Sequence, residues 1–90
     1  MIVVVRMRVR MDEKTCISLT RALEPDNRSA PRGVSISMEC DSQGLLCVVE
    51  CRNVPILTCR NTVDDVLEHV AMALKLVGRL DHAFKSRHIP

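Results

Sequence analysis

The chain has 90 residues, of which 47% are hydrophobic and 1% aromatic, and 13 Lys and Arg against 11 Asp and Glu give a formal net charge of +2. This length allows one compact domain that removes only about 60% of its unfolded surface from water, so support from a partner is expected. The aliphatic content excludes a disordered tail, and the absence of Tyr and Trp excludes a stacking platform for single-stranded nucleic acid; the small charge does not by itself indicate a nucleic-acid binder.

Residues 2–11 alternate between two faces, which predicts a strand. One face carries Val3, Val5, Met7, Val9 and Met11, and the other carries Ile2, Val4, Arg6, Arg8 and Arg10. The arginines interrupt the apolar residues, so this segment is not typical of a secretory signal peptide, and no apolar run reaches the roughly 20 residues of a membrane span. We therefore expect a cytoplasmic protein, also nuclear in a eukaryote.

A first helix is predicted to begin after Asp12, which is a suitable N-cap. Cys16, Leu19 and Leu23 recur at helical spacing over about three turns. Pro25 is expected to end the helix because it has no N–H group. The following residues, up to Gly33, contain a second Pro with Asp, Asn and Ser, which predicts a loop.

Residues 34–40 and 45–52 both alternate, and Asp41-Ser42-Gln43-Gly44 between them predicts a hairpin. If Cys40 pairs with Leu45, every inward side chain meets another inward side chain: Met38 opposes Cys47, Ile36 opposes Val49 and Val34 opposes Cys51. No two cysteines oppose each other in this register.

A second, long helix is predicted with Asn53 as its cap and Pro55 at an early position. Its apolar residues recur every three or four positions up to Gly78 or slightly beyond: Ile56, Cys59, Val63, Val66, Leu67, Val70, Leu74 and Val77. The last several residues are expected to fray.

The predicted order, β-α-β-β-α, indicates one domain over residues 1–90. It belongs to the α+β class, as a two-layer sandwich in which two helices cover one face of a three-stranded antiparallel sheet. The five cysteines, at 16, 40, 47, 51 and 59, fit neither paired bridges of a secreted framework nor two Cys-x-x-Cys zinc motifs. Most are therefore expected to be small buried hydrophobic residues.

The outward face of the sheet combines apolar and charged side chains. Its apolar residues are Ile2, Val4, Leu46 and Val48, and its arginines are Arg6, Arg8, Arg10 and Arg52. The apolar residues are interpreted either as scattered surface hydrophobes or as a symmetric homodimer face. The arginines form either a solvated, ion-paired surface or a phosphate-contacting one.

The second helix carries an additional apolar stripe, roughly opposite its core stripe at 100° per residue. Its members are Met72, Leu76, Leu80 and Ala83. Either this stripe packs on the first helix or frays after Gly78, or a partner helix lies against it.

We find no pattern of catalytic residues in the sequence: there is no Ser/His/Asp arrangement, no Gly-rich phosphate loop and no recognisable pair of catalytic carboxylates. Cys47 and Cys51 lie about 13 Å apart along one strand, too far to share a metal ion. No catalytic activity, cofactor or metal is therefore expected.

The phrase Ala22-Leu23-Glu24-Pro25-Asp26-Asn27, followed by a loop, two strands and Arg60-Asn61-Thr62 within a long helix, resembles the CTAG/Pcc family. The resemblance covers residues 3–80. It implies a homodimerising, non-catalytic subunit of the KEOPS/EKC complex, which docks its helices on the catalytic subunit that modifies tRNA with threonylcarbamoyl-adenosine and which has been linked to tRNA contact. A stand-alone RNA-binding α+β module and a scaffold of an unrelated complex are the alternatives.

Overall fold

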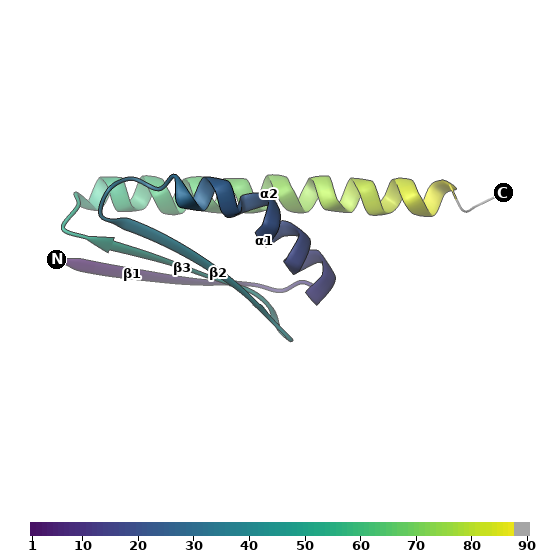
Figure 1. Ribbon diagram of the computed structural model, residues 1–90, viewed down its shortest axis with the longest axis horizontal. Coiled ribbons are helices and arrows are strands. Elements are labelled where there is room, and N and C mark those ends of the chain that lie inside the picture. The colour runs from purple at the N-terminus through teal and green to yellow at the C-terminus, as the bar shows by residue number, and fades with distance from the viewer. Residues whose placement is uncertain (88–90) are drawn as a thin grey trace.

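A computed structural model describes the backbone of residues 1–87 and the side chains of residues 1–77. It contains β1 (Ile2–Val9), α1 (Glu13–Arg28), β2 (Val34–Asp41), β3 (Gly44–Arg52) and α2 (Ile56–Arg87). The strands form one antiparallel sheet in the order β1-β3-β2, and both helices lie over the same face of it (Figure 1). The predicted α+β class and element order are confirmed.

The register of the sheet follows the alternation in the sequence. In the hairpin, Cys40 pairs with Leu45 and Val34 with Cys51, as predicted, while β1 pairs with the other side of β3. β3 is therefore the central strand, and its inward side chains are almost completely buried. The core combines them with residues of both helices and β2: Cys16, Leu19, Leu23, Val34, Leu45, Cys47, Val49, Cys51, Cys59, Val66 and Val70.

Helix α1 begins as predicted, because the Asp12 carboxylate accepts a hydrogen bond from the Thr15 N–H at 3.1 Å. Its predicted end at Pro25 is wrong, since the helix continues to Arg28. Proline removes only its own N–H bond, and the next residues still close the last turn: the Ser29 N–H donates to the Asp26 carbonyl and the Ser29 hydroxyl to the Pro25 carbonyl, both at 3.1 Å. The loop is correspondingly shorter than predicted.

The start of α2 differs from the prediction that Asn53 caps it. Asn53 has a left-handed backbone, with φ of 53°, and its side chain accepts a hydrogen bond from the Met1 ammonium at 2.9 Å. The first helical bond runs from the Cys59 N–H to the Pro55 carbonyl at 3.2 Å, so Pro55 takes the cap position. The helix also passes Gly78, because one glycine costs a helix only about 1 kcal/mol. Neither α1 nor the described part of α2 has the length and apolar character that a bilayer span requires.

Two members of the predicted core stripe of α2 are not core residues. Ile56 is 62% exposed and Leu67 is 44% exposed. Ile56 is the first residue of the helix, and Leu67 lies at the margin of the stripe that Val66 and Val70 place in the core. Helical spacing alone gives the centre of a buried stripe more accurately than its margin.

The expectation that most cysteines are buried is confirmed for Cys16, Cys47, Cys51 and Cys59, but four of the five cysteines are also paired in disulfide bonds, which their spacing did not predict. Cys16 of α1 is bonded to Cys40 of β2, and Cys51 of β3 to Cys59 of α2. The cysteines do not meet across the strands; each bond instead joins a helix to the sheet beneath it, which one-dimensional spacing does not show. Cys47 alone is free; it is buried, and burial raises the pKa of its thiol.

Candidate functional site

A groove of about 480 Å³ lies between the two helices. Apolar and polar side chains of both helices line it: Leu23, Asp26, His69, Met72, Ala73, Lys75 and Leu76. Met72 is 61% exposed and Leu76 is 60% exposed, so α1 does not cover them. Their position excludes the interpretation that this stripe simply packs on the first helix.

The groove has an apolar floor with charges at its margin. Leu23 is buried and Ala73 packs against the core, so the floor is part of the folded domain. Asp26 and Lys75 add one charge of each sign. An amphipathic helix, with an apolar ridge flanked by polar residues, has the complementary chemistry. The side chains of Leu80 and Ala83, which the sequence assigns to the same stripe, lie outside the described residues.

The two sequence phrases that resemble the CTAG/Pcc family meet in space. Asp26 and Asn27 from the first phrase and Thr62 from the second line one cavity of about 260 Å³, with Asp65 and His69 on α2. Thr62 is only 8% exposed, and its hydroxyl donates to the Thr58 carbonyl at 2.9 Å. This cavity shares Asp26 and His69 with the groove, so the phrases lie beside the candidate site.

The outward face of the sheet is a mixed surface. Ile2 is 59% exposed and Val4 is 47% exposed, whereas Leu46 and Val48 are half-buried. Across the strands the apolar side chains have polar neighbours, because Val48 lies between Arg6 and Ser37 and Leu46 lies between Arg8 and Glu39. Along β3, Leu46 and Val48 are neighbours on the same face. The four predicted dimer residues therefore share a face but do not form an uninterrupted apolar patch.

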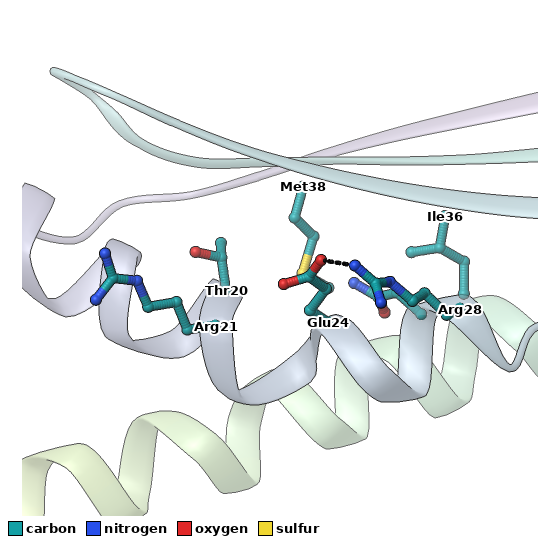
Figure 2. A pocket seen from close by; sticks show the side chains of 7 residues that line it. Thr20, Arg21, Glu24, Arg28, Ile36 and Met38 are labelled. Carbon is teal, nitrogen blue, oxygen red and sulfur yellow. Dashed lines mark hydrogen bonds and ion pairs between the residues drawn. The ribbon is translucent and has the colours of Figure 1, made fainter.

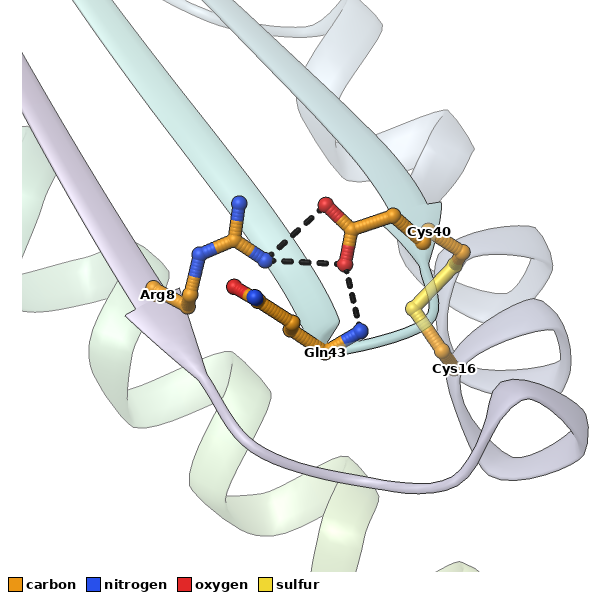
Figure 3. Close-up of polar contacts among 5 residues, drawn as sticks. Arg8, Cys16, Cys40 and Gln43 are labelled. Atoms are coloured by element: carbon orange, nitrogen blue, oxygen red, sulfur yellow. Dashed lines mark hydrogen bonds and ion pairs between the residues drawn. A yellow bond between two sulfur atoms is a disulfide. The ribbon is translucent and has the colours of Figure 1, made fainter.

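Two of the four outward arginines are ion-paired. Arg8 Nη1 donates to both carboxylate oxygens of Asp41, at 2.9 and 3.0 Å, and Arg52 Nε donates to Glu50 at 2.7 Å (Figure 3 shows the first pair). The hydrogen bond from the Gln43 N–H is the main cause that lowers the pKa of Asp41, and the hydrogen bond from Arg8 is the next. Arg6 and Arg10 have no ion pair with another described residue. Arg6 and Arg10 are therefore the two outward arginines that no described carboxylate engages.

No metal-binding cluster occurs in the described part of the chain. No group of three or more His, Cys, Asp or Glu side chains is arranged to hold a metal ion there. The free thiol of Cys47 is unsuited to nucleophilic chemistry, because it is buried and its pKa is raised.

Comparison of the chain with protein-family models, curated proteins and solved structures gives no match.

Proposed function

We propose that this chain is a non-catalytic subunit of a KEOPS/EKC-type complex. It docks the groove between its helices on a helix of the catalytic threonylcarbamoyl-transferase subunit and thereby supports tRNA modification. The observation that carries this proposal is the groove, in which Met72 and Leu76 are exposed and available to contact a helix. The agreement of the fold with the order that the resemblance implies, and the meeting of the two phrases beside the groove, support it.

The aspartate substitution Leu76→Asp tests the docking step. Burying Leu76 against a partner helix is worth about 1.5 to 3 kcal/mol, so a charge there is expected to abolish co-purification with the catalytic subunit and the restoration of tRNA threonylcarbamoylation in a reconstituted complex. Folding is expected to be unchanged, because Leu76 is 60% exposed. Circular dichroism and thermal melting check the fold.

Leu57→Asp is the matched control. Leu57 is also 60% exposed and lies on the same helix, but it does not line the groove. It is expected to retain both co-purification and activity. Equal loss with both variants, or unfolding by Leu76→Asp, contradicts the assignment of the groove.

Homodimerisation through the outward sheet face is a second part of the proposal. Light scattering at micromolar concentration is expected to give twice the 10.1 kDa mass of one chain. Leu46→Asp/Val48→Asp is expected to yield monomers, because two carboxylates at these half-buried positions would lose their hydration in a dimer interface. Ser18→Asp/Ala22→Asp, on the exposed side of α1, adds the same charge elsewhere and is expected to leave the dimer intact. A monomeric wild type, or a dimeric Leu46→Asp/Val48→Asp variant, refutes this face.

A tRNA contact through the same face is a weaker part of the proposal. Arg8 and Arg52 are already ion-paired, and a dimer formed there would also cover Arg6. The proposed location is the cytoplasm, and also the nucleus in a eukaryote. Disulfides are rare in these reducing compartments, so the two bonds are expected to be reduced there in part.

A further inference from the structure

A second groove lies on the other side of α1, where the helix faces the free edge of β2. It has a volume of about 540 Å³ and is lined by Thr20, Arg21, Glu24, Asn27, Arg28, Ile36 and Met38. Figure 2 shows Ile36 and Met38 extending from β2 toward the helix, beside the polar side chains of α1. Both are half-buried, so the groove has an apolar floor open to solvent.

The backbone of the same two residues is free to bind another strand. The Arg52 N–H donates to the Gly33 carbonyl at 2.7 Å, so Gly33 and Arg52 form a hydrogen-bonded pair. Such pairs alternate along an antiparallel ladder, which places Ser35 and Ser37 in bonded pairs with β3 and turns the N–H and C=O groups of Ile36 and Met38 toward the open edge. Strand order confirms that β2 is an edge strand.

The wall of the groove is positively charged. Arg21, Glu24 and Arg28 follow one another along the exposed side of α1, giving two cations against one anion. Arg28 is paired with Glu24, whereas Arg21 has no ion pair with another described residue. The net charge of this wall favours a ligand that carries carboxylates.

We propose that this groove binds an extended, acidic peptide segment of another protein, which adds to the edge of β2 as a fourth strand. Residues of the peptide opposite Ile36 and Met38 would hydrogen-bond to their backbone and turn their side chains into the groove. There an aliphatic side chain contacts the apolar floor and a carboxylate reaches Arg21 or Arg28. The alternate residues lie beside Ser35, Ser37 and Glu39 on the outward face and are polar.

The same charges disfavour a second copy of this chain at this edge. A symmetric pairing of two β2 strands would bring the α1 helices of both copies side by side, each with a net positive wall. An acidic peptide neutralises the positive charge of this wall, whereas a second copy would bring a second positive wall beside it. The inference is independent of the proposed function, because it uses the opposite side of α1.

The test uses a fluorescein-labelled nonapeptide, Ser-Glu-Ser-Val-Ser-Glu-Ser-Val-Ser, in which Glu and Val share one face of the strand. Fluorescence anisotropy is expected to show saturable binding to the wild type, with slower hydrogen exchange of the Ile36 and Met38 amides. Arg21→Gln/Arg28→Gln is expected to weaken binding by about tenfold or more, since charge-assisted hydrogen bonds are lost. Arg60→Gln, an exposed arginine on α2, is the matched control and is expected to bind like the wild type.

Two further peptides separate strand addition from simple charge attraction without altering the protein. Replacing both Val residues by N-methylvaline removes the N–H groups that face β2 and is expected to abolish binding. Replacing both Glu residues by Lys is expected to do the same. Equal binding of either peptide, or binding without protection of Ile36 and Met38, overturns the proposal. A wild-type dimer in which these two amides are already protected also overturns it, because a second copy then occupies the edge.

Discussion

Reduction of both disulfide bonds is expected to lower the free energy of unfolding by about 6 kcal/mol. The Cys16–Cys40 bond closes a segment with a sequence separation of 24 residues, and Cys51–Cys59 one of 8. By the entropy of loop closure these bonds contribute about 3.5 and about 2.6 kcal/mol. Small domains are typically stable by only about 5 to 15 kcal/mol, so the reduced chain lies near the limit of folding.

Urea unfolding with and without a phosphine reductant measures this effect. Cys16→Ser/Cys40→Ser is expected to lose more stability than Cys51→Ser/Cys59→Ser, because its bond closes the longer segment. The protein with all four substitutions is the control, and reductant is expected to leave its midpoint unchanged. Alkylation after denaturation without reductant is expected to label Cys47 alone. Labelling of all five cysteines, or an unchanged midpoint after complete reduction, contradicts the prediction.

The disulfides also bear on the groove between the helices. Each bond fixes one helix to a different strand, α1 to β2 and α2 to β3. The groove forms only when both helices are packed on the sheet, because Leu23 of α1 and Met72 of α2 both line it. In a reducing compartment, binding of the proposed partner helix would therefore supply part of the stability that the bonds otherwise provide.

The sheet was the most predictable part of the fold. Apolar and polar residues alternate along a strand that has one buried face, so the inward residues of β2 and β3 could be identified from the sequence. Only one hairpin register placed all of these inward side chains opposite one another. The structure reproduces that register from Val34 opposite Cys51 to Cys40 opposite Leu45. Helix boundaries were less predictable, because capping and tertiary packing decide them: Ser29 closes a helix that Pro25 seemed to end.

The candidate site was predictable only in part. Helical spacing identified Met72 and Leu76 as an apolar stripe apart from the core, and both are exposed. It did not show that Leu23 and Asp26 of α1 complete the groove, because that depends on how the helices pack. The Arg8–Asp41 pair and both disulfides were missed for the same reason, since each joins residues of different elements.

The substitution Gly44→Ala is expected to lower the free energy of unfolding by about 3 kcal/mol. Two causes add to this loss: a positive φ that alanine rarely adopts, and close contacts of the added methyl group. Gly44 has a φ of 119°, which side chains rarely adopt. An added Cβ would lie 2.7 Å from the Met11 nitrogen and overlap the Val9 carbonyl oxygen, which are backbone atoms just after β1 and at its last residue. The methyl group therefore forces apart the junction of β1 and the hairpin.

Urea unfolding of Gly44→Ala and of Gln43→Ala measures this cost. Gln43 is the exposed neighbour in the same turn, and its backbone N–H, which donates to Asp41 at 2.8 Å, survives the substitution. Gln43→Ala is therefore expected to change stability by no more than about 0.5 kcal/mol. A Gly44→Ala protein as stable as the control would mean that β1 does not pass this closely over the turn. The positive φ and the close approach of the chain at the end of β1 together require glycine at position 44.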